Sequence, residues 1–273
     1  MSRELKPRTV GDTIGEVLAV FVAHWATIIG VVGAVTVPLL LVQSVIARNV
    51  IDYEALVDDQ LVVNQGALRN VLVLYLFTFA AAALASGAVV RTVAGAYIDD
   101  VPDIGPAISF AAGHLGVLIV ASLLWVVAIV VGLFLFIIPG VIIGVGTVVW
   151  AGAALIERHT ASGSLRRSWE ITSRRKWHVF VVLLVVAILG TVLSSTVSGI
   201  ATWLGQEPAA PPTLNTIVLA IGANVATSAL FSTATAVMYL ELRSRKEGAE
   251  IVLEDLRNRF QPQPGTAGPD LLR

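Results

Sequence analysis

The feature that most constrains the fold of this chain is a set of long segments that contain no charged residue. The longest extends from Leu115 to Ile156, and only Pro139 followed by Gly140 interrupts its apolar character. Since about 20 apolar residues in a helix cross the hydrocarbon core of a bilayer, this segment has room for two spans. Proline and glycine are also the residues at which a turn is expected. The segment therefore predicts two membrane-spanning helices, at 115–138 and 141–156, joined by a very tight turn.

Composition also indicates a membrane protein and excludes several kinds of function. Hydrophobic residues make up 56% of the 273 residues and charged residues 14%, with a mean hydropathy of +0.83. Soluble domains carry roughly a quarter charged residues. Strict alternation of polar and apolar residues is missing, which argues against a membrane β-barrel. The chain has no cysteine, which excludes disulfides, thiolate catalysis and cysteine-ligated metals.

Four further apolar runs predict spans at 25–47, 71–90, 179–204 and 214–240. The first belongs to a longer run, which we divide at His24 and Trp25 because a polar and an aromatic residue suit the membrane interface. The segment from Thr13 to Ala23 then forms an amphipathic surface helix with Asp12 or Thr13 as its N-cap. Short interfacial helices are also expected at 104–113 and within the basic segment 157–178.

These elements predict an all-α fold, a polytopic membrane bundle of six transmembrane helices with short amphipathic interfacial helices before spans one, three and five. Residues 1–242 form the membrane domain, with a polar external loop at 48–70 and a proline-rich external turn at 206–212. Residues 243–273 form a cytoplasmic tail that is weakly helical around Val252, Leu256 and Phe260 and then disordered.

The distribution of cations predicts the orientation of the chain. With six spans and the N-terminus inside, only Arg48 and Arg69 lie in external loops, and the other 16 of the 18 Lys and Arg are cytoplasmic. Cytoplasmic loops of membrane proteins carry an excess of Lys and Arg. We therefore predict that both termini are cytoplasmic.

The order of the elements suggests an internal repeat. The segment that starts at Ile14 resembles the one that starts at Ile104, and the same offset of 90 residues places His24 on His114. Lys176 occupies the corresponding place in a looser third unit. The chain can therefore be interpreted as three parallel copies of an interfacial helix followed by two spans, an arrangement found in transporters. The alternative is that helices rich in alanine and valine align by chance.

Several short motifs resemble those of a known family. The turn Ile138-Pro139-Gly140 is followed by a span, by Glu157 and by the run SLRRSW at 164–169, and residues 7–8 and 15–18 match as well. This pattern resembles the six-helix membrane domain found beside glycerophosphodiester phosphodiesterase domains in some bacteria, and related stand-alone prokaryotic membrane proteins. Ser164, which precedes Leu165, stands where the pattern has alanine, and Glu170 interrupts its basic run.

The resemblance covers most of residues 7–242 and implies a six-helix prokaryotic membrane domain. It does not imply phosphodiesterase activity, because a catalytic barrel needs about 250 further residues. We therefore place the chain in the cytoplasmic membrane of a prokaryote as a multi-pass protein, and we do not expect it to be an enzyme.

The basic segment contains the charged residues that we single out. Glu157, at the end of span four, is predicted to form a structural ion pair with Arg167, with Arg158 and Arg166 as other possible partners. The competing interpretation is a gate or a proton-linked carboxylate. The neighbouring cations are predicted to contact anionic lipid headgroups, and the alternative is that they only determine topology. These cations are Arg166, Arg167, Arg174, Arg175 and Lys176.

Polar residues within the spans have two interpretations. Asn224 in span six and Gln43 near the outer end of span one are predicted to form interhelical hydrogen bonds, or alternatively to line a solute path. Metal ligands would need convergent geometry such as an i, i+4 histidine pair, which the four histidines do not provide. We predict no catalytic residue, no metal site and no cofactor.

The sequence favours a non-catalytic membrane scaffold or regulatory module that contacts anionic membrane lipids. A small-solute transporter or channel is the alternative, and a membrane-embedded lipid-modifying enzyme is the third interpretation. Nucleic acid is not an expected partner. A homo-oligomer or a complex with another membrane protein stays open, since the glycines of span four offer a packing face.

Overall fold

The computed structural model describes residues 5, 8–50, 65–204 and 213–261, and every regular element in these residues is a helix. Six helical segments of the described chain are long and apolar enough to cross a membrane, which confirms the predicted fold class. The helices are α1 (Val10–Ala23), α2 (Trp25–Val50), α4 (Gln65–Tyr97), α5 (Ile104–Ala112), α6 (Leu115–Leu135), α7 (Ile137–Thr147), α8 (Trp150–Ile156), α9 (Ala161–Thr172), α10 (Lys176–Trp203), α11 (Leu214–Glu247) and α12 (Ala249–Phe260).

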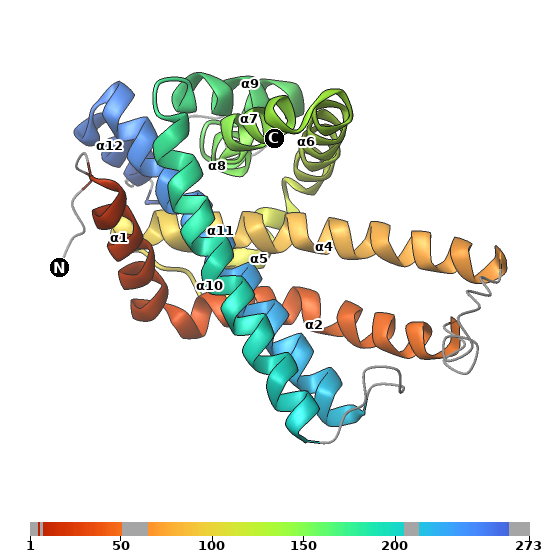
Figure 1. Cartoon of the computed structure of the whole chain (residues 1–273). Helices are drawn as coiled ribbons and strands as arrows, with labels where there is room; N and C mark the ends of the chain where they lie inside the picture. Colours follow the sequence, from red (N-terminus) through yellow and green to blue (C-terminus); the bar gives the residue numbers. More distant parts are fainter. Residues whose placement is uncertain (1–4, 6–7, 51–64, 205–212, 262–273) are drawn as a thin grey trace.

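In the described chain, the same order of a short helix followed by two spans occurs three times. A short helix (α1, α5 or α9) precedes a pair of spans, which are α2 with α4, α6 with the broken helix α7–α8, and α10 with α11. In Figure 1, α2 and α4 extend side by side to the right, while α10 and α11 extend side by side to the lower right. We call the end that carries α1, α5, α9 and α12 the polar end. The predicted interfacial helices before spans one, three and five are thus present.

The start of α1 differs from the prediction. The N-cap is Thr9, whose side chain accepts a hydrogen bond from the backbone N–H of Asp12, while the Asp12 carboxylate accepts one from Thr9 N–H. This reciprocal capping box satisfies two backbone donors that a helix start leaves unpaired. Thr13 is therefore not the cap but a buried residue of the first turns. The predicted division between His24 and Trp25 is confirmed, because α1 ends at Ala23 and α2 begins at Trp25.

The turn between spans three and four lies three residues before the predicted position. Phe136 has extended backbone angles and separates α6 from α7, whereas Pro139 is the third residue of α7. The first N–H groups of a helix have no partner within that helix, so proline fits there without the loss of a hydrogen bond. The two helices approach closely, since a Cβ atom on Gly132 would lie 2.8 Å from the Cα of Gly140.

Span four is broken into α7 and α8 at Val148 and Val149, which the sequence analysis did not anticipate. The carbonyl oxygen of Gly146 accepts hydrogen bonds from Thr172 Oγ1 at 2.7 Å and Ser168 Oγ at 3.3 Å, both from α9. Side chains that insert into the hydrogen-bond ladder of a helix interrupt it. The Trp169 ring also packs on Gly146, where a Cβ atom would lie 2.4 Å from it.

The C-terminal region is more ordered than predicted. Helix α11 continues to Glu247, and α12 is a full helix in which Val252 and Leu256 are completely buried. Arg259 Nη1 of α12 donates to the carbonyl of Leu155, near the end of α8. Residues 249–260 therefore pack on the membrane domain rather than forming a weak tail. The disordered end predicted after them lies outside the described residues, as do most of the predicted loop at 48–70 and the turn at 206–212.

The glycines of span four pack within the chain. Gly140 lies against Leu133 of α6, Gly144 faces Ile129 of α6, and a Cβ atom on Gly152 would lie 2.3 Å from the ring of Tyr239 on α11. Small residues permit this close contact between helix backbones. The glycine face that suggested a dimer is thus used by contacts between helices of the same chain.

Candidate functional site

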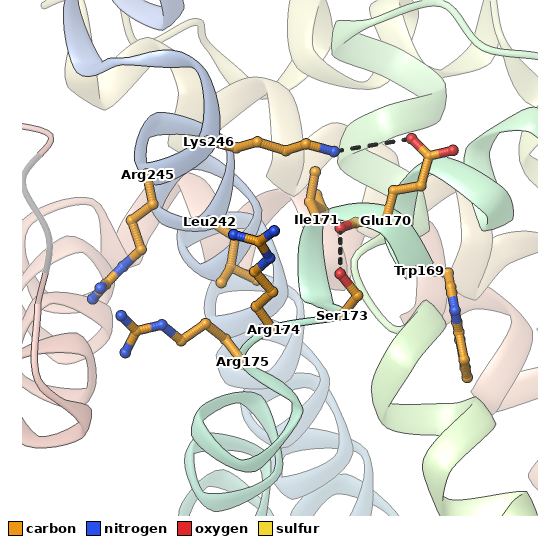
Figure 2. Close-up of a pocket in the computed structure, with 9 residues that line it drawn as sticks. All are labelled: Trp169, Glu170, Ile171, Ser173, Arg174, Arg175, Leu242, Arg245 and Lys246. Atoms are coloured by element: carbon orange, nitrogen blue, oxygen red, sulfur yellow. Dashed lines mark hydrogen bonds and ion pairs between the residues drawn. The ribbon is translucent and has the colours of Figure 1, made fainter.

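A basic groove of about 830 Å³ lies at the polar end, between the α9–α10 turn and the last turns of α11 (Figure 2). Four cationic side chains line it, Arg174 and Arg175 from the turn and Arg245 and Lys246 from α11. Glu170 is the one carboxylate among its lining residues in the described chain. The local charge is therefore strongly positive.

Two of the four cations of the basic groove are compensated by carboxylates. Arg245 donates from Nε and Nη2 to Glu241 Oε1, at 3.0 and 2.6 Å, and Lys246 Nζ lies 4.0 Å from Glu170 Oε2. Arg174 and Arg175 are exposed, and neither forms an ion pair with an acidic side chain of the described residues. The positive charges of these two arginines repel each other in the groove. An anion bound there would attract both arginines and offset this repulsion.

Aromatic side chains border the basic groove. Trp169 lines it, and Lys176 Nζ lies 3.2 Å from the centroid of the Trp169 ring. Trp177, at the start of α10, is 75% exposed and stacks on Phe180 with ring centroids 5.4 Å apart. Tryptophan is enriched where a transmembrane helix meets the headgroup region. Trp169 lines the groove and Trp177 lies in the first turn of α10, so both tryptophans lie close to the start of a span.

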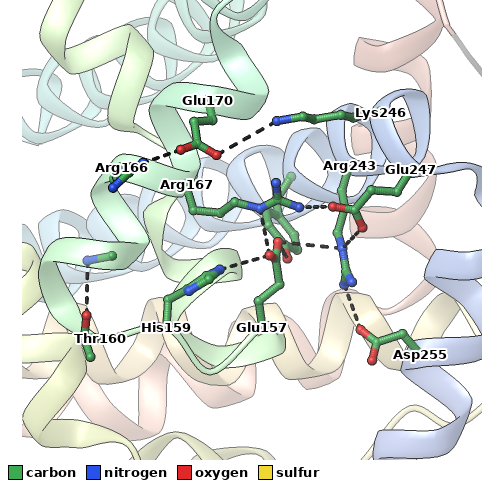
Figure 3. A network of polar contacts seen from close by, with 12 residues as sticks. Glu157, His159, Thr160, Arg166, Arg167, Glu170, Arg243, Lys246, Glu247 and Asp255 are labelled. Atoms are coloured by element: carbon green, nitrogen blue, oxygen red, sulfur yellow. Dashed lines mark hydrogen bonds and ion pairs between the residues drawn. The ribbon is translucent and has the colours of Figure 1, made fainter.

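A second group of charges, the Glu157 cluster, ties four helices together (Figure 3). Glu157 Oε2 accepts a hydrogen bond from Arg167 Nε of α9 at 2.7 Å, and Oε1 accepts one from the Tyr239 hydroxyl of α11 at 2.6 Å. Arg243 Nε lies 3.6 Å from Glu157 Oε1 and bonds Glu247 at 2.8 Å, and Arg167 also bonds Glu247. From Arg243 the network continues to α12, where Asp255 Oδ2 lies 2.9 Å from Nη1. His159 Nε2 lies 3.1 Å from Glu157 Oε2.

The Glu157 cluster holds its central carboxylate ionised. Burial raises the pKa of Glu157, but the hydrogen bonds from Tyr239 and Arg167 and the charges of Arg167 and Arg243 outweigh it, so that the pKa lies below its ordinary value. The Glu157 side chain is only 12% exposed. A carboxylate of low pKa bound by two arginines is a poor proton donor or acceptor at neutral pH. The geometry is that of a structural tie.

Glu241 of α11 is the most deeply buried carboxylate of the described residues, with a side chain 1% exposed. Its Oε2 accepts a hydrogen bond from Thr13 Oγ1 of α1 at 2.7 Å, and Arg245 binds its Oε1. His178 Nε2 of α10 lies 3.8 Å from Oε1 and 3.2 Å from Thr13 Oγ1. These contacts fix α1 and α10 against the end of α11, directly beside the basic groove.

A central cavity of about 450 Å³ lies between the six spans. Each span contributes to its lining, for example Thr36 of α2, Ser86 of α4 and Trp125 of α6. No charged side chain of the described residues lines it. Its polar lining consists of hydroxyl, amide and indole groups, from Thr36, Thr78, Ser86, Ser122, Trp125, Trp150, Asn224, Thr227, Ser228, Ser232 and Thr235.

Two polar atoms at the central cavity are buried without a hydrogen-bond partner, Trp125 Nε1 and Thr227 Oγ1. An unsatisfied buried polar group costs about 1–3 kcal/mol. The indole N–H can only donate a hydrogen bond, so it needs an acceptor. The cavity therefore has an unused hydrogen-bonding capacity, and its size lies within the range of roughly 300–1,000 Å³ found for ligand sites.

The structure separates the five predicted lipid-contacting cations into groups. Arg174 and Arg175 face the basic groove, Lys176 covers Trp169, and Arg166 is exposed and pairs with Glu170. Arg167 is instead 15% exposed within the Glu157 cluster. The interpretation of Arg167 as a headgroup ligand is not supported, because its guanidinium is already bound by two carboxylates. The structure does bring Arg167 and Glu157 together as the proposed ion pair.

The structure also places the predicted polar residues of the spans. Asn224 is exposed and lines the central cavity, whereas Gln43 is half-buried near the end of α2 and does not line it. Their predicted interhelical hydrogen bonds stay predictions. The sequence analysis missed Arg245 and Lys246 as groove residues and the hydroxyl groups that surround Asn224. Arg245 and Lys246 belong to a charged run directly after a span, which is a signal that could have indicated them.

Comparison of the chain with protein-family models, with curated proteins and with solved structures gives no match. The resemblance of its motifs to the phosphodiesterase-associated membrane domain therefore stays a prediction, and the functional argument rests on the basic groove and the central cavity.

Proposed function

We propose that this chain is a non-catalytic scaffold or regulatory module of the prokaryotic cytoplasmic membrane, held to anionic lipid by its basic groove. The observation that carries the proposal is the pair Arg174 and Arg175, which lack an acidic partner in the described chain and share a groove with Arg245 and Lys246. Phosphate groups of anionic lipids offer the charge that such a groove lacks.

The position of the basic groove favours a lipid headgroup over a soluble anion. The groove lies where α9 ends, α10 begins and α11 ends, Trp169 lines it, and the exposed Trp177 lies in the first turn of α10. Cations at this level contribute about 1 kcal/mol each next to an anionic surface. In this proposal the polar end and both termini face the cytoplasm, where the positive-inside rule places basic segments.

The test compares the stability of the purified chain in micelles that contain phosphatidylcholine or phosphatidylglycerol. We expect phosphatidylglycerol to raise the midpoint of heat-induced aggregation. The double variant Arg174→Gln with Arg175→Gln is expected to lose about 2 kcal/mol of this stabilisation, equivalent to roughly 30-fold in lipid affinity. High salt should reduce the effect, because it screens exposed charges.

Arg166→Gln is the matched control for the lipid test. Arg166 lies on α9, the helix that precedes the turn with Arg174 and Arg175, and its side chain is 85% exposed, but it pairs with Glu170 and does not line the basic groove. The control should keep the full response to phosphatidylglycerol. An equal response in the double variant would contradict lipid binding in the groove, and an equal response to inorganic phosphate would indicate a soluble anion instead.

A second candidate function is the passage of an uncharged solute, which the central cavity favours. A shallow groove of serine and threonine hydroxyls on α10, formed by Thr191, Ser194, Ser195 and Ser198, meets this cavity at Thr227. Release of glycerol from proteoliposomes tests passage. Flux that Asn224→Leu abolishes and Thr196→Val preserves would establish transport and contradict the scaffold proposal, since Thr196 lines neither the cavity nor the groove on α10.

A further inference from the structure

The central cavity has no role in the proposed contact with lipid headgroups. It lies between the spans, and Thr36 and Trp125 contribute to it from near the middle of α2 and α6. The charged residues of the basic groove and of the Glu157 cluster are absent from its lining in the described chain. A separate explanation is needed for a hollow of this size between the spans.

The lining of the central cavity combines acceptors with two unpaired polar groups, an indole N–H and a hydroxyl. The hydroxyls of Thr36 and Ser122 donate to carbonyls of their own helices, at 2.8 and 2.9 Å, so their oxygens keep lone pairs that can accept. Trp125 Nε1 is a buried donor without an acceptor, and Thr227 Oγ1 is a buried hydroxyl without any partner. A molecule that both accepts and donates hydrogen bonds would satisfy this lining.

We propose that the central cavity binds an uncharged molecule that carries a hydroxyl group and an apolar part. The hydroxyl oxygen accepts from Trp125 Nε1, and its hydrogen is donated to Thr227 Oγ1 or to a neighbouring serine or threonine. The apolar part packs on Val32, Leu40 and Phe79, which also line the cavity. A charged ligand is excluded, because no opposite charge stands in the lining and a charge at membrane depth is unfavourable.

Thr227 is the residue of this site that variants can test most cleanly. It lies on α11 where α10 crosses it, and its methyl group occupies the space that a side chain at Gly190 would take, 2.7 Å from the Cβ position. Thr227→Val keeps that methyl group and replaces the hydroxyl with a second methyl group of similar size. Ser122→Ala tests the same cavity from α6. Thr196→Val on α10 is the control, because its hydroxyl is exposed and bonds the carbonyl of Val192.

The experiment measures saturable binding of tritiated alcohols to the full chain in lipid nanodiscs by scintillation proximity. Stearyl alcohol reports a ligand that arrives from the lipid, and the water-soluble 1-butanol reports one that arrives from water. Stearate is the charged counterpart of stearyl alcohol.

We expect one of the two alcohols to bind saturably and stearate not to bind. Thr227→Val and Ser122→Ala should weaken binding by about threefold to tenfold, as for the loss of one hydrogen bond, and Thr196→Val should leave it unchanged.

Three results would overturn the inference: no saturable binding of either alcohol, binding that neither cavity variant weakens, or stearate binding as tight as that of stearyl alcohol. The measurement is independent of the proposed function. Binding can be present without any flux of solute, and the basic groove can hold lipid whether or not the cavity is occupied.

Discussion

At the scale of single residues, the Glu157 cluster shows how a buried carboxylate can join helices that are distant in the sequence. Glu157 is bound by Arg167 of α9 and by Tyr239 of α11, and Arg243 links it to α12. Loss of one member of a buried ion pair leaves the other charge uncompensated, which costs about 3–5 kcal/mol. The cluster is partly exposed to solvent, so we expect the lower part of that range or less.

The pH dependence of stability tests the Glu157 cluster. The pKa of Glu157 is lower in the folded chain than its ordinary value of 4.5, so its ionised form stabilises the fold at pH values above 4.5. This stabilisation is lost as the pH falls below 4.5 through the folded pKa. We expect the unfolding midpoint of the unaltered chain in detergent to fall in this acid range. Glu157→Gln should be less stable at pH 7 and lack this part of the acid dependence.

Glu250→Gln serves as the control for the pH experiment, because Glu250 is an exposed carboxylate on α12. Its stability at neutral pH should match that of the unaltered chain. A Glu157→Gln variant that is as stable as this control at pH 7 would show that the Glu157 cluster does not hold the helix ends together.

Only part of these residue contacts could be predicted from the sequence. Glu157 and Arg167 are ten residues apart across one turn, and a lone carboxylate beside several arginines indicates an ion pair. Tyr239 and Glu241 give no such signal, because one lies in an apolar run and the other at its end. Their partners Glu157 and Thr13 are 82 and 228 residues away in the sequence. The unpaired atoms at Trp125 and Thr227 depend on the exact packing of three spans.

At the scale of elements, α12 is the helix whose importance the sequence least revealed. Its polar residues give it the composition of a tail, yet Val252 and Leu256 are fully buried and Phe260 lies under the Arg91 guanidinium, 4.1 Å from the ring centroid. Its apolar residues recur every four positions, which is the spacing of one helix face. That pattern predicts a helix but does not tell what the face packs against.

Substitutions on the two faces of α12 test whether it is an integral part of the fold. Leu256→Ala removes a completely buried side chain and should lower the free energy of unfolding by about 2–5 kcal/mol. Ile251→Ala removes an apolar side chain that is 59% exposed, and it should change stability by under about 1 kcal/mol. The thermal midpoint of the purified chain in detergent measures both. Equal midpoints for the two variants would contradict the docking of α12.

The boundaries of the spans show where element prediction succeeds. The junction predicted at His24 and Trp25 is correct, because this polar and aromatic pair interrupts the apolar run between α1 and α2. The turn predicted at Pro139 is misplaced, because proline is equally suited to the first turn of a helix, and Pro139 lies in the first turn of α7. The break before α8 depends on hydroxyls of α9, which are 22 and 26 residues away from Gly146, and no local pattern indicates it.

At the scale of the whole molecule, six apolar helices and one polar end account for most of the described residues. The short helices α1, α5 and α9 and the helix ends near them carry the charged clusters, and the central cavity lies between the spans. The lengths of the apolar segments were enough to predict this architecture, because a helix that crosses a bilayer needs about 20 apolar residues regardless of which helices pack beside it. The orientation and the position of the basic groove at the cytoplasmic face are the parts that an experiment has to establish.

The most direct test uses single cysteines, which the natural absence of cysteine makes unambiguous. Ser173→Cys places a thiol in the basic groove, and Ala209→Cys places one in the proline-rich turn that the sequence predicts on the other side. A membrane-impermeant maleimide should label Ala209→Cys in intact cells and Ser173→Cys only after the cells are opened. Labelling of Ser173→Cys in intact cells to the same extent as in opened cells would contradict the proposed threading and the lipid contact that depends on it.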